Sequence, residues 1–108
     1  MSGARQYDDR SAVARALNHI GERWAILIVD RLSAGALRFS DLRRRLGSIS
    51  PNVLTQRLAD LEASGVVRRV MMAAPVSGWV YELTPRGEAL APVLDALDAW
   101  GSSLPSGD

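Results

Sequence analysis

The amino-acid sequence predicts an α+β fold that is mainly helical. Apolar residues recur at helical spacing in five segments, glycines and prolines separate these segments, and two β-rich runs joined by a short turn follow Gly65. The 108 residues suffice for one compact domain and are too few for two. We expect residues 1–10 to form a flexible polar arm, residues 11–101 the domain, and residues 102–108 a polar tail.

The composition excludes several kinds of chemistry. The chain has no cysteine and a single histidine, His19, which excludes disulfides, thiol redox switches and metal clusters built on histidine or thiolate. It lacks a glycine-rich phosphate loop and a nucleophile–base pair, so we expect neither an enzyme nor a cofactor. No signal pattern opens the chain, and its longest dense apolar run, residues 24–29, is far too short to span a bilayer. These features favour a cytoplasmic location.

The first two helices are predicted from the spacing of apolar residues. Val13, Leu17 and Ile20 mark one face of a helix from about Ser11 onward, and Gly21 interrupts it. Residues 23–33 are apolar almost all round, which is typical of a central, buried helix.

The middle of the chain predicts two short helices joined by a tight turn. Ser40 is expected to cap a helix that ends at Leu46. Ser50 and Pro51 are a strong start signal for the next helix, which Gly65 closes. The apolar stripe of this helix should face the core, so the opposite face carries Asn52, Thr55, Gln56 and Arg57.

The last third of the chain predicts a hairpin and one further helix. Residues 66–72 and 79–83 form the strands, and residues 73–78 form the loop. Thr84 and Pro85 start a last helix to about Trp100, with Pro92 tolerated near its first turns or as a kink. With a short extended segment at 36–39, the order of elements is that of a winged helix-turn-helix.

The charge is concentrated in the middle of the chain. Residues 38–69 contain seven arginines and three acids, whereas the remainder contains six arginines and nine acids. All basic residues are arginine, whose planar fork suits phosphates and guanine edges. The pattern predicts a polyanion-binding centre between neutral or acidic helices.

Several short motifs occur in a distinctive order along residues 12–101. They are Ala16-Leu17 to Ile20-Gly21, Arg23-Trp24 to Ile28, Gly35 with Arg38-Phe39-Ser40-Asp41-Leu42-Arg43, Ile49-Ser50, Leu54-Thr55-Gln56-Arg57-Leu58, Leu61-Glu62 to Gly65-Val66-Val67-Arg68-Arg69, Val80-Tyr81-Glu82-Leu83-Thr84 to Gly87, Leu90, and Trp100-Gly101. Together they resemble the HxlR-type winged helix-turn-helix regulators, a MarR-like family.

The resemblance implies a bacterial repressor or activator that binds duplex DNA as a homodimer, paired through its first and last helices. Twofold symmetry predicts a pseudo-palindromic operator, with recognition helices about 34 Å apart. Several members of the family carry a cysteine before the first helix that senses oxidants or electrophiles. Ser11 stands at the corresponding place, so thiol sensing cannot be carried over to this chain.

The predicted recognition helix begins at Ser50, and its exposed polar side chains suit base edges and phosphates in a major groove. Arg68 and Arg69 should point to opposite faces of their strand, so that one reaches phosphate, while the loop has no arginine to probe a minor groove. The candidates for contact with DNA are Ser40, Arg43, Arg44, Ser50, Asn52, Thr55, Gln56, Arg57 and Arg69. Two alternatives are an ordinary solvated helix face and a winged helix that binds an acidic protein in place of DNA.

The first and last helices carry more apolar surface than a small domain needs, which indicates an intersubunit bundle. The candidate dimer residues are Val13, Leu17, Ile20, Leu90, Val93, Leu94, Leu97 and Trp100. Trp24, Trp79 and Trp100 are candidates for the pocket of an unidentified small-molecule effector. The alternative for these tryptophans is packing in the core or at the interface.

Overall fold

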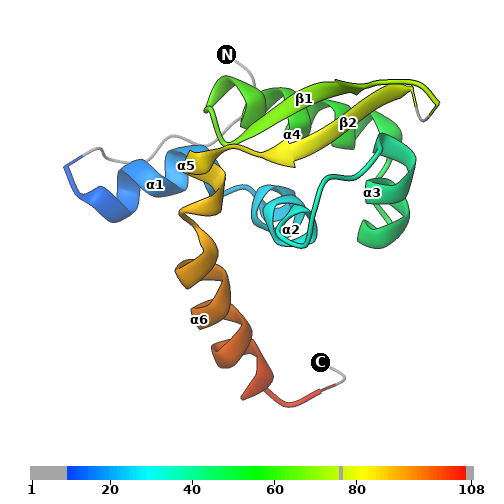
Figure 1. The fold of residues 1–108 in the computed structure, drawn as a ribbon. Helices are drawn as coiled ribbons and strands as arrows, with labels where there is room; N and C mark the ends of the chain where they lie inside the picture. The colour runs from blue at the N-terminus through cyan, green and yellow to red at the C-terminus, as the bar shows by residue number, and fades with distance from the viewer. Residues whose placement is uncertain (1–9, 76, 107–108) are drawn as a thin grey trace.

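The computed structural model describes residues 10–75 and 77–106, and it confirms the α+β class (Figure 1). The arm predicted for residues 1–10 lies outside these residues, apart from Arg10. One antiparallel two-stranded sheet accompanies the helices, in the order α1 (Ala12–Ile20), α2 (Arg23–Leu32), α3 (Phe39–Leu46), α4 (Pro51–Ala63), β1 (Val67–Met72), β2 (Gly78–Leu83), α5 (Pro85–Glu88) and α6 (Ala91–Ser102).

Side-chain caps begin both α1 and α2. The Ser11 hydroxyl accepts a hydrogen bond from the Ala14 N–H at 3.0 Å, and the Glu22 carboxylate accepts from the Trp24 N–H at 2.7 Å. Both caps satisfy backbone donors that have no partner within their helix. Gly21 lies between the helices, where a β-carbon would collide with the Leu17 carbonyl oxygen, so the chain can turn there only without a side chain.

The start of α3 differs from the prediction, whereas the start of α4 confirms it. Helix α3 begins at Phe39 after Arg38, so Ser40 lies exposed in its first turn and is not the cap. At α4 the Ser50 hydroxyl accepts from the Val53 N–H at 3.2 Å. Pro51 occupies the first turn, where its missing N–H removes no helical hydrogen bond.

The hairpin is tied to the link before α3. Leu37 exchanges two backbone hydrogen bonds with Tyr81, at 3.0 and 2.8 Å, which confirms an extended link, although it ends before Phe39, the first residue of α3. The next residue, Arg38, donates from its guanidinium to the Ser77 carbonyl at 2.9 Å. The link therefore supports both the edge of β2 and one end of the hairpin loop.

The last helix is divided, in place of the single helix predicted from Pro85 to Trp100. Helix α5 has only four residues, and α6 begins after Leu90 with Pro92 in its first turn. Because proline has no N–H, this position suits the start of a new helix better than the middle of a longer one. Helix α6 then runs away from the hairpin and α4 (Figure 1).

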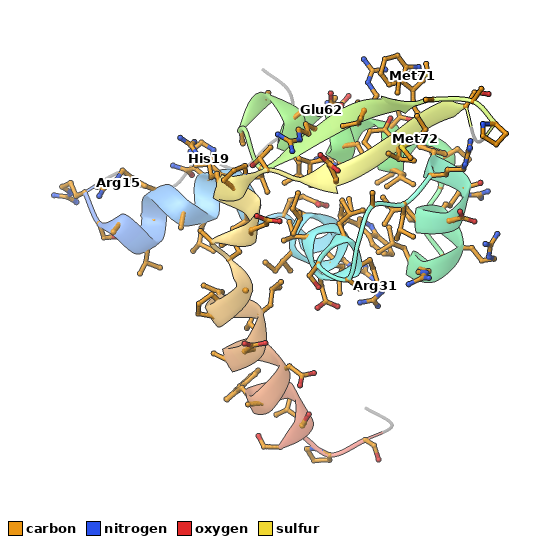
Figure 2. The ribbon with its side chains drawn as sticks, in the orientation of Figure 1. Arg15, His19, Arg31, Glu62, Met71 and Met72 are labelled. Atoms are coloured by element: carbon orange, nitrogen blue, oxygen red, sulfur yellow. The ribbon has the colours of Figure 1, made fainter. Side chains whose placement is uncertain are left out.

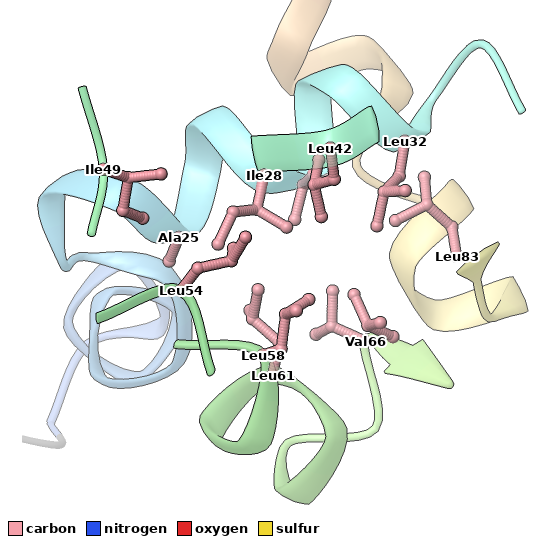
Figure 3. Close-up of a cluster of buried hydrophobic side chains, with 12 residues drawn as sticks. Ala25, Ile28, Leu32, Leu42, Ile49, Leu54, Leu58, Leu61, Val66 and Leu83 are labelled. Carbon is pink, nitrogen blue, oxygen red and sulfur yellow. The ribbon is translucent and has the colours of Figure 1, made fainter. Parts of the chain in front are cut away.

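The core lies around α2, which confirms the prediction of a central, buried helix. Ile28 and Val29 of α2 are fully buried, and Leu42, Leu54, Leu58 and Leu61 from α3 and α4 pack in the same cluster (Figure 3). Val66, Val67 and Leu83 join it from the base of the hairpin. The three α4 leucines follow helical spacing, so their burial fixes which face of α4 is exposed.

Arg57 does not lie on the exposed face, and that expectation was wrong. Its side chain is 23% exposed, donates to the Asp60 carboxylate at 3.2 Å, and lies 3.9 Å from the carboxylate of Glu22. Its Nε is buried without a hydrogen-bond partner among the described residues. Because Glu22 caps α2, this cluster links the middle of α4 to the start of α2.

The described residues contain no helix long and apolar enough to cross a membrane.

Replacing Leu54 with alanine should lower the free energy of unfolding by about 2–5 kcal/mol, because the fully buried side chain would leave a cavity between α4 and α2. Urea denaturation followed by circular dichroism measures the change. Thr55→Ala, one residue further along and exposed, is the matched control and should leave stability within about 0.5 kcal/mol of the wild type. Equal losses in the two variants would contradict this assignment of the core.

Replacing Arg57 with methionine should lower the free energy of unfolding by about 1 kcal/mol, because the carboxylates of Glu22 and Asp60 would lose their cation. The same urea titration applies. Arg45→Met removes an exposed arginine of α3 and should change stability little. The linking role of Arg57 is refuted if both arginine variants are as stable as the wild type.

Candidate nucleic-acid interface

Helices α3 and α4 and the hairpin lie together on one part of the molecule, and α6 extends away from them (Figure 1). The exposed face of α4 carries Asn52, Thr55 and Gln56, as predicted. Gln56 donates from its side-chain amide to the Asp60 carboxylate at 3.0 Å. The side chains of Asn52 and Thr55 form no hydrogen bond with the described residues, so they present free donors and acceptors along the helix.

The three arginines of α3 are held differently. The Nε of Arg43 donates to the Ile49 carbonyl at 3.2 Å, which fastens the turn between α3 and α4. Arg44 pairs with Asp41 on its own helix, although most of its side chain is exposed. Arg45 is exposed and forms no ion pair within residues 10–75 and 77–106. Helix α3 therefore carries three exposed arginines, of which Arg43 lies at the turn that leads into α4.

The two arginines of β1 point to opposite faces, as predicted. Arg68 pairs across the hairpin with Glu82 at 2.6 Å. Arg69 lies on the other face with its guanidinium 4.8 Å from the centre of the Trp79 ring and 3.9 Å from the carboxylate of Glu62 in α4. Burial raises the pKa of the Tyr81 phenol, which lies opposite Arg69 in the register.

The hairpin loop carries no charge in its described part, residues 73–75 and 77. Met71 and Met72 precede it and point to opposite sides of the hairpin (Figure 2). Positive charge on the hairpin therefore lies along the strands, at Arg68 and Arg69, and not at the loop.

The predicted dimer residues divide into two groups. Five are exposed in the single chain, with exposed fractions from 39% at Leu17 to 69% at Val13. These five are Val13, Leu17, Val93, Leu97 and Trp100. Ile20, Leu90 and Leu94 instead pack against the core of their own chain. The exposed group lies on α1 and α6, outside the helix-turn-helix and hairpin.

The three tryptophans are not brought together within one chain. Trp24 packs against the core from α2, beneath the guanidinium of Arg23 at 5.1 Å. Trp79 lies exposed on β2, and Trp100 lies near the end of α6 with 65% exposure. A groove of about 540 Å³ is present between α1, α2 and α4, but charged residues such as Glu22, Arg57 and Asp60 line it, and no tryptophan does. The small-molecule effector stays a prediction.

Sequence reasoning missed the residues that hold the site in place. Asp60 binds both Gln56 and Arg57, and its spacing of four and three residues from them is the signal that could have revealed this. The contact of Trp79 with Arg69 follows from strand alternation once the register is known, but the register depends on the loop. His19 of α1 bonds to Ser64 after α4 at 2.8 Å, a contact over 45 residues that has no local signal.

Comparison with known proteins agrees with this arrangement. The family model described as HxlR-like helix-turn-helix matches residues 19–106. A protein of Methanothermobacter thermautotrophicus, named an uncharacterized HTH-type transcriptional regulator, is 39% identical over 90 residues, which cover 83% of this chain and 69% of the relative.

Solved structures give the same result. The crystal structure of the HTH-type transcriptional regulator YtcD is 38% identical, with a TM-score of 0.78 over 85% of this chain and 94% of that one. The redox regulator HypR in its oxidized form is 31% identical, with a TM-score of 0.81 over 89% of this chain and 99% of that one. The family match covers most of the chain, and these structures share its arrangement of helices and hairpin. The chain therefore belongs to the HxlR-like helix-turn-helix family.

Proposed function

We propose that this protein regulates transcription by binding duplex DNA as a homodimer, with α4 as the recognition helix. One observation carries the proposal: the free side chains of Asn52 and Thr55 lie exposed on α4, which follows the arginines of α3 and is contacted at Glu62 by Arg69 of the hairpin. A polar helix face with cations on the two neighbouring elements fits a major groove bordered by phosphates. The relatives named above are regulators, which supports a role without catalysis.

The α4 side chains supply the chemistry of base recognition. Asparagine and glutamine amides each offer a donor and an acceptor that match the N6 and N7 edge of adenine, and a threonine methyl can contact the methyl of thymine. Asp60 orients the amide of Gln56 by the hydrogen bond described above. Asn52, Thr55 and Gln56 are therefore the proposed base contacts, whereas Arg57 contributes by fixing α4 against α2.

Phosphate contacts are proposed for the residues around this face. Ser50 lies at the N-terminus of α4, where backbone N–H groups and the helix dipole favour an anion. Helix α3 supplies Ser40, Arg43 and Arg44, and the hairpin supplies Arg69. Such contacts fix the register of the protein on the duplex without specifying its sequence.

The exposed apolar residues of α1 and α6 support the proposed homodimer. A side chain such as Leu97, 47% exposed, or Trp100 gains free energy when a second copy covers it. A twofold axis through these helices would place two α4 helices about 34 Å apart, which matches one turn of DNA.

A titration with salt tests the proposal against the alternative, an acidic protein partner. The affinity for a duplex from the region upstream of the gene should fall steeply as salt rises, because bound arginines release counterions from the DNA. Fluorescence anisotropy measures the affinity. An affinity for DNA that is absent or independent of salt would refute DNA binding and favour the protein partner.

Asn52→Ala should weaken binding to the operator by about ten-fold, since a good side-chain contact with a base contributes about 1–3 kcal/mol of discrimination. Its affinity for a mixed-sequence duplex should stay at the wild-type value, because phosphate contacts are unchanged. Anisotropy titrations with the two duplexes provide the comparison. An equal loss on both duplexes would show that Asn52 does not read bases.

Leu97→Glu should convert the dimer to monomers and weaken operator binding, because a buried, unpaired carboxylate opposes association. Analytical ultracentrifugation measures the molecular mass. Met71→Glu alters an apolar residue of similar exposure on the hairpin and should leave the dimer intact. A dimeric Leu97→Glu variant would place the interface elsewhere.

A further inference from the structure

The roles proposed above do not explain the contact between Arg69 and Trp79 in the hairpin. Trp79 is an indole with 47% exposure on a strand of a small domain, where it adds little to the core. It pairs with Met71, two pairs along the register from Arg69 and Tyr81, so all four share one face of the hairpin. This face therefore joins an arginine to an exposed aromatic ring.

Two groups hold the guanidinium of Arg69. The Trp79 ring lies 4.8 Å from it, within the range of a cation–π contact, and the Glu62 carboxylate of α4 lies 3.9 Å from its Nε. The pair with Glu62 is long, and both side chains are partly exposed, so it neutralises the arginine only weakly. The guanidinium is thus fixed between β2 and α4 while much of its surface stays accessible.

Arg68, the other arginine of β1, is less available than Arg69 to bind an anion. Arg68 faces the opposite side and is bound to Glu82 at 2.6 Å. The described loop residues contain no cation at all. Arg69 is therefore the hairpin cation best placed to bind an anion beside α4.

We propose that Trp79 holds Arg69 in position to bind a backbone phosphate of duplex DNA, so that the hairpin contacts DNA through this face of its strands and not through its loop. The inference rests on the proposed function, since it requires that the protein bind DNA. Trp79 acts as a positioning residue. A free arginine side chain has many rotamers, and a contact that fixes the guanidinium beforehand lowers the entropy lost on binding.

A double-mutant cycle on a fluorescently labelled mixed-sequence duplex tests the proposal. Arg69→Gln should reduce the slope of log affinity against log salt by about 0.9, the value for one phosphate contact. Arg68→Gln, which removes the paired arginine of the opposite face, is the matched control and should leave the slope unchanged. Circular dichroism confirms that each variant is folded.

The variants of Trp79 show whether it acts through Arg69. Trp79→Leu should weaken binding about three-fold in the wild-type background, which is typical of an exposed cation–π contact, and should have no effect when Arg69 is already glutamine. Trp79→Phe, which retains an aromatic face, should restore most of the affinity. The inference is overturned if Trp79→Leu has no effect, or has the same effect in both backgrounds.

The cycle also separates this inference from the proposed function. If the wild-type protein shows no salt-dependent affinity for DNA, both fail together. If the wild type binds DNA and the slope is unchanged in Arg69→Gln, the proposed function stands and the role of Trp79 and Arg69 is refuted.

Discussion

The burial of one stripe of α4 against α2 is the interaction on which the rest of the structure depends. Leu54, Leu58 and Leu61 are almost completely buried in the cluster around Ile28. Since a helix repeats every 3.6 residues, burial of this stripe forces Asn52, Thr55 and Gln56 outward. The same packing that stabilises the domain therefore determines which polar side chains of α4 are exposed. A core of this kind tolerates little rotation of α4 without the loss of close contacts.

Polar contacts then limit the remaining freedom of α4. Arg57 joins α4 to the cap of α2 through Glu22, and Arg43 fastens the turn before α4 through the Ile49 carbonyl. Individually such contacts contribute little, because the groups are partly solvated. These contacts act on the position of α4: Arg57, which the sequence suggests for DNA contact, instead joins α4 to the start of α2. Charge alone therefore does not reveal the role of an arginine in this domain.

The hairpin and the terminal helices extend the domain in two directions. The hairpin is anchored by the pairing of Leu37 with β2, by Arg38 at its loop end and by buried valines at its base, and Arg69 lies on its α4 side. Helix α6 leaves the domain with apolar side chains exposed. The absence of cysteine separates this chain from the thiol-sensing members that the resemblance suggests.

The sequence by itself determined the class of fold, the position of most elements and the exposed face of α4, because caps, glycines and helical periodicity are local signals. Ser50, Pro51 and Gly65 mark their helix without reference to any distant residue. Tertiary structure alone decided that Arg57 turns toward Glu22, that α3 begins before Ser40, and that Trp79 stacks on Arg69. These outcomes depend on partners 10 or more residues away, or on which of two neighbouring residues caps a helix. The energies of these contacts are fixed only when the whole chain is packed.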